Sequence, residues 1–303
     1  MLRPPDDFDP IVGAAIEVQP GLRRIVAPNP SPMTYRGTNT YLLGDRDIAV
    51  IDPGPLSDPH LASILDALTP AQRISHIIVT HTHIDHSPLA APLAAATGAP
   101  VIAFGDATAG RSAVMHQLAA SGLAGGGEGI DAGFTPDTEV AEGEVIDGGD
   151  WQLEVIHTPG HLGNHIALAW GTACFTADHV MGWASSLVSP PDGDLTDFMA
   201  SCRKLRARDW DVFHPGHGAP VDDPAARLDW LIRHRLSREA AILDALEDGP
   251  ATARALAERI YIETPPALLG AAERNVFAQL IDLAGRSEVS TTDRLAADAV
   301  FCL

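Results

Sequence analysis

The sequence predicts an α/β fold over the first two thirds of the chain and a helix-rich tail after it. Short apolar runs typical of β-strands alternate with helical patterns up to about residue 221, and from residue 222 onward the pattern is mainly helical. The chain has 303 residues, of which 46% are hydrophobic, so it can form a sizeable core. We therefore predict two domains, residues 1–221 and residues 222–303.

The predicted strands are apolar runs bounded by turn residues. They cover residues 22–27, 39–43, 48–51, 74–80, 101–104, 151–157, 165–170, 173–176 and 211–214. Helices are expected at 58–68, 87–97, 108–120 and 195–207, and in the tail at 224–246, 251–261 and 266–284, with a short hairpin in 288–303. Asp58-Pro59 and Ser87-Pro88 predict helix starts, because Asp and Ser cap free N–H groups and Pro fits the first turn. The glycine-rich stretch 123–133 is predicted to be a flexible loop.

Charge and composition exclude several classes of protein. Forty acidic residues against twenty basic ones give a net charge of −20, and Lys204 is the single lysine, so a polyanion is repelled unless a local basic patch overrides the field. No apolar run approaches the ~18 residues of a membrane helix. The N-terminus MLRPPDDFDP lacks an apolar stretch after Arg3, so we expect it not to be a secretory signal. The three cysteines are isolated and odd in number, which predicts reduced thiols and a cytoplasmic protein.

One short segment carries four potential metal ligands. His81, His83, Asp85 and His86 follow the apolar run 74–80 and precede a helix start. Residues two apart on an extended segment share a face, so His81 and His83 can converge on one cation, while Asp85 and His86 lie where the chain turns toward a second. A histidine pair on a loop is common by chance, but three His and one Asp within six residues favour a site for zinc, with iron or manganese as alternatives.

Three further candidates lie just beyond the ends of predicted strands. They are His161, Asp178 and His217. Strand ends that meet at one edge of a sheet are where α/β proteins place their sites. Together with the first segment these residues supply five His and two Asp, enough for two metal ions with room left for water.

These motifs resemble the metallo-β-lactamase-fold hydrolase superfamily, whose signature is H-x-H-x-D-H followed by separate His, Asp and His. The resemblance is closer to its winged-helix-tailed branch, the beta-lactamase-like protein two family. The segments that carry it are 37–41 (Gly-Thr-Asn-Thr-Tyr), 52–54 (Asp-Pro-Gly), 157–161 with His165, 215–218, 234–239 (His-Arg-Leu-Ser-Arg-Glu), Ile260-Tyr261 and Asn275. The resemblance extends from about residue 22 to about residue 289.

The resemblance implies a four-layer αββα sandwich followed by a small winged-helix-like domain. It also implies roles for named residues: His81, His83 and His161 would bind one metal ion, Asp85, His86 and His217 the other, Asp178 would bridge both, and Asp52 would support the ligands from behind.

Two positions depart from the family pattern. Ala177 stands where a Gly usually precedes the bridging Asp, and Ser87-Pro88-Leu89 replaces Ser-Gly-Gly. The second change removes flexible N–H groups and disfavours a phosphate cradle at that helix start.

The implied mechanism is hydrolysis by a metal-bridging hydroxide. Two divalent ions about 3.5–4 Å apart lower the pKa of a shared water to roughly 7. Asp85 would orient or deprotonate that water. His165 or His179 would protonate the leaving group, or else pack or hydrogen-bond behind the ligands. His214 is expected to support a ligand from behind. The loop 181–194 would either overhang the site and select the substrate or be a plain surface connection.

Three functions remain open. The first is hydrolysis of a small acyl substrate, an ester, thioester or lactone. The second is a metal-dependent endoribonuclease. The tail disfavours it, because nine Arg, no Lys and fourteen acidic residues give the tail a net charge of −5, whereas a nucleic-acid-binding domain normally has a basic face. Arg227, Arg233, Arg235 and Arg238 would be its RNA-binding patch, or else a solvated helix face balanced by Asp229 and Glu239. The third is a DNA-binding regulator, although the tail is expected instead to pack on the first domain or to form a homodimer.

Overall fold

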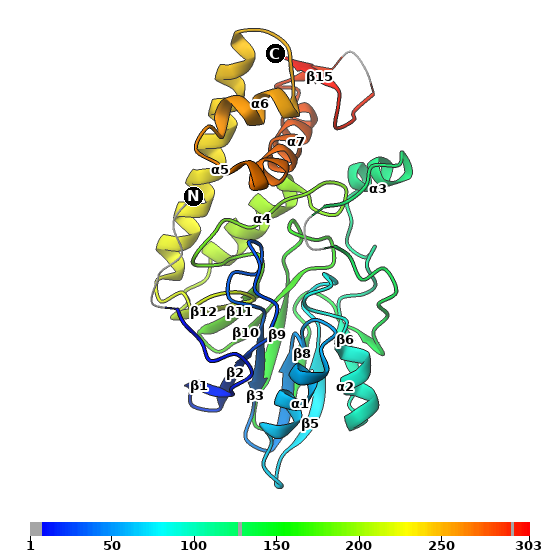
Figure 1. The fold of residues 1–303 in the computed structure, drawn as a ribbon, viewed down its shortest axis with the longest axis vertical. Coiled ribbons are helices and arrows are strands. Elements are labelled where there is room, and N and C mark those ends of the chain that lie inside the picture. Colours follow the sequence, from blue (N-terminus) through cyan, green and yellow to red (C-terminus); the bar gives the residue numbers. More distant parts are fainter. Residues whose placement is uncertain (1–7, 127–128, 292–293) are drawn as a thin grey trace.

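The computed structural model describes residues 8–126, 129–291 and 294–303 (Figure 1). Residues 1–7, on which most of the prediction of no secretory signal rests, lie outside this range. So do two residues of the predicted loop 123–133 and two of the predicted hairpin 288–303. Within the described residues, no helix is both long and apolar enough to cross a membrane.

The first two thirds of the chain form two sheets that pack face to face. The seven-stranded sheet has the strand order β1 to β7: Ile16–Gln19, Leu22–Val26, Asn39–Leu43, Asp47–Ile51, Arg73–Ile78, Val101–Ala103 and Thr138–Glu139. The five-stranded sheet has the order β12-β11-β10-β9-β8. In chain order its strands β8 to β12 are Val145–Asp147, Gln152–His157, Ile166–Trp170, Ala173–Ala177 and Val212–Pro215.

Both faces of the central strands are buried, which explains why they are continuous apolar runs in the sequence. In β4, Ala49 and Ile51 face the other sheet, while Ile48 and Val50 pack with Ile64 of a covering helix. The seven-stranded sheet is covered by α1 (Asp58–Asp66) and α2 (Ala90–Thr97), and the five-stranded sheet by α4 (Leu195–Arg206) and the start of α5 (Pro224–Glu247). The four layers are therefore helix, sheet, sheet and helix, as predicted.

Two helices of the first region start later than predicted. α2 begins at Ala90 because the Ser87 hydroxyl bonds back to the His83 carbonyl and to Asp131. α3 (Ala113–Ala120) begins after a turn in which Asp106 accepts from the N–H groups of Thr108 and Ala109. The strands β1, β7 and β8 were not predicted, because they are only two to four residues long and carry exposed residues.

The tail contains α5, α6 (Ala253–Ile260), the short 3-10 helix η1 (Pro266–Leu268) and α7 (Leu269–Gly285), with a three-stranded sheet in the order β13-β15-β14. The strands are Ala251–Thr252, Val300–Cys302 and Ser290–Thr291. The antiparallel pairing of β14 and β15 is the predicted hairpin, whereas β13 was not predicted. This order of elements agrees with a winged-helix domain, which stays a prediction.

The helix α5 joins the two regions (Figure 1). Leu228 and Leu231 in its first half pack against the five-stranded sheet and α4, whereas Ile242 and Leu246 in its second half pack with α6 and α7. The predicted boundary at residue 222 lies just before α5, but the helix contributes to both cores. The tail therefore packs directly on the first region.

Candidate metal centre

The H-x-H-x-D-H segment follows β5 and lies at the edge where several strands end. His161 follows β9, Asp178 follows β11 and His217 follows β12. The structure brings all seven predicted ligands into two overlapping groups, each with its ligand atoms within 4.8 Å of one another. One group is His81, His83, His161 and Asp178, and the other is Asp85, His86, Asp178 and His217.

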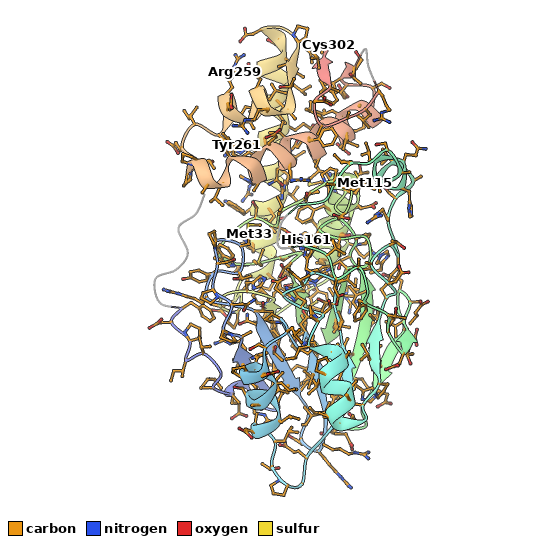
Figure 2. All side chains as sticks on the ribbon, turned by 45° about the vertical axis from the view of Figure 1, so that its right-hand side comes forward. Met33, Met115, His161, Arg259, Tyr261 and Cys302 are labelled. Atoms are coloured by element: carbon orange, nitrogen blue, oxygen red, sulfur yellow. The ribbon has the colours of Figure 1, made fainter. Side chains whose placement is uncertain are left out.

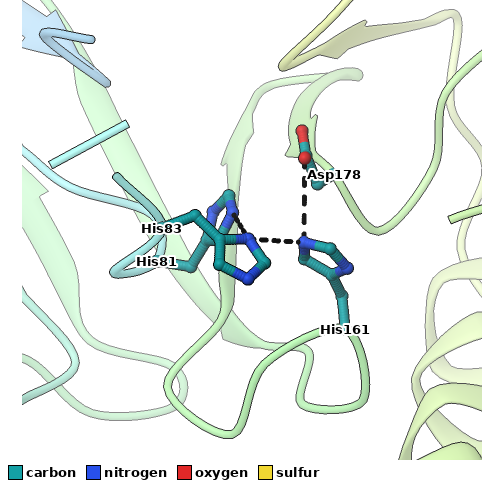
Figure 3. A group of neighbouring side chains, drawn as sticks. All are labelled: His81, His83, His161 and Asp178. Atoms are coloured by element: carbon teal, nitrogen blue, oxygen red, sulfur yellow. Dashed lines mark hydrogen bonds and ion pairs between the residues drawn. The ribbon is translucent and has the colours of Figure 1, made fainter. Parts of the chain in front are cut away.

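The first group is a compact set of imidazoles facing one carboxylate (Figure 3). The Nδ1 of His83 lies 3.1 Å from the Nε2 of His81 and 3.0 Å from the Nε2 of His161. The same nitrogen of His161 lies 3.7 Å from Asp178 Oδ2.

The second group alternates imidazoles and carboxylates. The Nε2 of His217 lies 3.2 Å from Asp85 Oδ2 and 3.3 Å from Asp178 Oδ2. The Nε2 of His86 lies 3.3 Å from Asp85 Oδ2 and 3.5 Å from Asp178 Oδ1. Asp178 thus contacts both groups, as the sequence resemblance implies for a bridging ligand.

These spacings fit divalent metal ions. Four ligands at 2.0–2.1 Å from a tetrahedral ion lie about 3.3 Å from one another, close to the separations in both groups. Asp85 Oδ1 and Asp178 Oδ1 are buried without a hydrogen-bond partner among the described residues. An orphaned buried carboxylate oxygen is costly unless a cation faces it, so the donor set fits the implied metal.

The protonation of the imidazoles differs between the groups. Burial lowers the pKa of His83 to about 3, and burial also lowers the pKa of His161, so both rings are neutral and offer lone pairs. Burial alone would lower the pKa of His217, but Asp178 and Asp85 outweigh it and raise that pKa to about 10. The second group therefore holds positive charge between two carboxylates, and a metal ion would supply that charge and displace the proton.

Hydrogen bonds from behind orient the imidazoles toward the centre. The Nδ1 of His86 donates to Asp52 Oδ2 at 2.9 Å, and Asp52 also accepts from the backbone N–H and hydroxyl of Thr80. The Nδ1 groups of His161 and His217 face the carbonyl oxygens of Leu187 and Gly37. Such contacts fix the tautomer and leave Nε2 free to bind a metal. Asp52 occupies the predicted supporting position.

Two backbone positions explain local sequence choices. Gly216 has no room for a side chain, because a Cβ there would collide with Asp178 Oδ1 and lie 2.8 Å from His86 Cε1. Ala177, which replaces the family's glycine, has φ of +40° in the left-handed region. This conformation favours glycine. The fold therefore accommodates alanine at position 177 with local backbone strain.

His165 and His179 do not lie where a leaving group could take their proton. Both side chains are fully buried, and neither lines the cavity beside the metal centre. The Nδ1 of His165 faces the Thr158 hydroxyl at 2.8 Å, and the Nε2 of His179 faces Cys202 Sγ at 3.5 Å. Burial lowers the pKa of His179 to about 3. The burial of both rings and their absence from the cavity lining give no support to their predicted catalytic role.

His214 also differs from expectation. Its Nε2 contacts Gln19 at 3.1 Å, and its ring packs near Tyr41 and Phe175. No hydrogen bond joins it to a ligand among the described residues, so it is a core residue and does not support the metal centre directly. Asn39 and Tyr41 instead hold the turn before His217, because both donate to the Pro215 carbonyl.

A cavity of about 360 Å³ opens beside the metal centre. Five proposed ligands line one side: His83, Asp85, His161, Asp178 and His217. Five residues of the loop 181–194 line it as well: Met181, Trp183, Ala184, Ser185 and Leu187. The loop is therefore part of the cavity wall and not a plain surface connection.

The tail closes the opposite side of the cavity. Residues of α5, η1, α7 and the connection between α6 and η1 line it: Trp230, His234, Arg235, Arg238, Tyr261, Thr264, Leu268, Ala271, Ala272 and Asn275. Figure 2 shows Tyr261 in the tail region, with Met33 and His161 in the region below it. Trp230 was not predicted as a site residue, because a tryptophan at helical spacing is as typical of a hydrophobic core as of a binding site.

The tail also holds the loop that carries a ligand partner. Arg235 donates to the Ser186 carbonyl, and Asn275 Oδ1 accepts from the Val188 N–H at 3.1 Å. Leu187, between these two residues, is the carbonyl partner of His161. One chain of contacts thus connects the tail with the first metal group.

Neither earlier interpretation of the four α5 arginines is correct. Arg227 and Arg235 are 8% and 3% exposed, so no RNA-binding surface patch contains all four. The predicted balancing acids pair elsewhere, Asp229 with Arg206 and Glu239 with Arg286. The helix instead turns one cationic and aromatic face toward the cavity.

The αββα layers and the buried His and Asp groups define a metallohydrolase of the metallo-beta-lactamase type. Comparison with known sequences agrees: residues 33–217 match the family model described as Metallo-beta-lactamase superfamily. The chain is 30% identical over 279 residues, 88% of each sequence, to the "Beta-lactamase-like protein 2 homolog" of Drosophila melanogaster. The chain belongs to the metallo-beta-lactamase superfamily.

Two other proteins are similar to this chain. The "Atrochrysone carboxyl ACP thioesterase" of Passalora fulva is 26% identical over 257 residues, 79% of this chain and 68% of the thioesterase. A beta-lactamase domain protein from Burkholderia ambifaria superposes with a TM-score of 0.81 over 99% of this chain and 97% of its own, at 21% identity. The latter shares the fold over the tail as well as the sandwich.

Proposed function

We propose that the protein is a binuclear, zinc-dependent hydrolase of a small acyl substrate, an ester, thioester or lactone, in the cytoplasm. The observation that carries the proposal is a cavity of about 360 Å³ that is lined both by metal ligands and by apolar side chains of the loop and tail. Its volume is typical of small-molecule sites. The free thiols Cys174, Cys202 and Cys302 favour a reducing compartment.

The residues divide the chemistry between them. Two divalent ions bound here would lower the pKa of water and polarise the scissile carbonyl. Asp85 lines the cavity, with Oδ2 directed to His86 and His217 and Oδ1 without a partner among the described residues. With one carboxylate oxygen on a metal ion, the other oxygen of Asp85 would accept the proton of the attacking water and orient it. Asp52 keeps His86 in the tautomer that leaves Nε2 unprotonated.

Several features favour an acyl substrate over RNA. The N-terminus of α2 offers no phosphate cradle, because the Leu89 N–H donates to Gly54 and the Ala90 N–H to Ser87. The tail has a net charge of −5, lines the cavity, and buries Arg227 and Arg235, two of the four arginines of the predicted RNA-binding patch. A thioesterase among the similar proteins is consistent with acyl chemistry.

A side-by-side assay tests the proposal. Purified protein should contain close to two equivalents of zinc, and it should hydrolyse members of a panel of thioesters, esters and lactones but not single-stranded RNA. Asp178→Ala protein is the control, since it loses the shared ligand. Less than one equivalent after remetallation contradicts the binuclear site, and RNA cleavage that Asp178→Ala abolishes contradicts the acyl substrate.

We further propose that the tail serves the hydrolase and is not a DNA-binding regulator. Its α5 side chains line the cavity and its α7 residue Asn275 holds the loop. A homodimer stays a prediction, and sedimentation of the full chain measures it. Specific binding of double-stranded DNA by the full chain would contradict this proposal.

A further inference from the structure

Arg238 is a cation in the cavity wall with no acidic partner among the residues that the structure describes. It lies on α5 and lines the cavity, and none of the ion pairs among residues 8–126, 129–291 and 294–303 includes it. The neighbouring Glu239 is paired with Arg286 and the nearby Asp229 with Arg206. In a chain with a net charge of −20, an arginine that reaches a cavity without a carboxylate partner is unusual.

The guanidinium group is held in place without being neutralised. Its central carbon lies 4.6 Å from the centre of the Tyr261 ring, which stabilises the cation through the face of the ring. Its Nε is buried and has no hydrogen-bond partner in the described part of the chain. The terminal nitrogens are not among the buried unpartnered atoms, and no hydrogen bond joins them to a described residue. Because Arg238 lines the cavity, these nitrogens are available to a ligand there.

The other polar groups of this wall are already used or carry no charge. The terminal nitrogens of Arg235 donate hydrogen bonds to Asn275 Oδ1 and to the Ser186 carbonyl. His234 stacks on Trp230 with ring centres 4.9 Å apart, and burial lowers its pKa to about 4, so it is neutral near pH 7. Of the described residues that line the cavity, only Asp85 and Asp178 are acidic, and both belong to the metal centre.

We propose that Arg238 binds a carboxylate at the end of the substrate remote from the scissile acyl bond. A planar guanidinium binds a carboxylate through two parallel hydrogen bonds. One free cation matches the single charge of a carboxylate, whereas a phosphate dianion would leave charge unbalanced. The inference rests on the proposed acyl-hydrolase function and narrows it to substrates with an apolar body and an anionic tail.

The test uses the metal-loaded enzyme and two matched substrates. One is the phenyl thioester of a linear dicarboxylic acid with its far carboxylate free, in chain lengths from four to eight carbons. The other is the same compound with that carboxylate methylated. The wild-type enzyme should show kcat/KM at least about tenfold higher for the free carboxylate at one chain length, as expected for a charge-assisted hydrogen bond.

Two variants of the same helix locate the effect. Arg238→Gln should bring the ratio of the two kcat/KM values close to one. Arg233→Gln, at an exposed position of α5, should keep the wild-type ratio. A wild-type ratio of one, or an Arg238→Gln enzyme that keeps the preference, overturns the inference. The wild-type ratio alone decides the matter if the Arg238→Gln protein does not fold.

Further arms separate this inference from the proposed function. If wild-type enzyme hydrolyses neither thioester, calorimetric binding of the free dicarboxylate to wild-type and Arg238→Gln protein still tests Arg238. The proposed function itself fails only if the esters and lactones of the panel are not hydrolysed either. Binding that is at least about tenfold weaker in the variant supports the inference, and equal binding overturns it. Tighter binding of the same chain ending in phosphate, or RNA cleavage that depends on Arg238, also overturns it.

Discussion

The two sides of the cavity are built differently. On the metal side, the seven proposed ligands are at most 7% exposed, and neighbouring hydrogen bonds hold several of the imidazoles in one orientation. On the tail side, Arg238 and Tyr261 are only partly buried and keep polar groups available to a ligand. Under the functions proposed above, the sandwich would carry out the reaction and the tail would select the substrate.

The largest effect is expected at the residue shared by both metal groups. Asp178→Ala should remove both ions and reduce hydrolysis at least about a thousandfold, because the electrostatic stabilisation of the reaction is lost with them. Metal analysis and the thioester assay measure this, with Asp209→Ala at an exposed position as control. Two retained equivalents of metal in Asp178→Ala would contradict the bridging role.

A methyl group at Gly216 should damage the metal side without changing any ligand. Gly216→Ala places a Cβ against Asp178 Oδ1 and His86 Cε1, so we expect loss of metal from the second group and a fall in rate of about a hundredfold, comparable to losing a transition-state contact. Gly270→Ala is the matched control, since its Cβ meets no atom within 4 Å. Equal metal content in the two variants would contradict this account.

The contact between tail and loop should have an intermediate effect. Asn275→Ala leaves the Val188 N–H and one Arg235 nitrogen without their partner, at a cost of about 1–3 kcal/mol in stability. Because the loop positions His161, kcat should fall about tenfold, a loss equivalent to about 1.4 kcal/mol. The measurements are kcat and metal content, with Glu273→Ala on the same helix as control. An unchanged kcat would show that the two sides act independently.

The smallest effect is expected at Ala177. Alanine in the left-handed conformation costs about 1–2 kcal/mol of folding free energy, and glycine relieves this strain. Two effects act in the opposite direction: the loss of a buried methyl group costs about 0.8 kcal/mol, and glycine adds backbone entropy to the unfolded chain. These contributions nearly cancel, so Ala177→Gly should change the free energy of unfolding by less than about 1 kcal/mol. The urea midpoint measures this, and destabilisation above about 2 kcal/mol would show that the methyl group has a packing role.

The fold and metal ligands could be predicted because their signals are local. Continuous apolar strands such as β4 predict a sheet buried on both faces, and His81, His83, Asp85 and His86 fall within six residues. His165 and His179 misled the prediction, because adjacency to a ligand in sequence does not give the direction of a side chain. Short strands such as β7 carry too few residues for a pattern to be recognised.

The sequence by itself determined the succession of strands and helices and the candidate metal-binding side chains, since strand patterns and ligand spacing operate over a few residues, while the sandwich was implied by the family resemblance. Only the tertiary structure decided which face of α5 meets the cavity. The arginines of that helix look alike in sequence, yet packing buries Arg235, leaves Arg233 in solvent and turns Arg238 to the substrate side. Which acid pairs with which arginine depends on contacts between distant segments, and those contacts decide where an unpaired charge is left to bind a ligand.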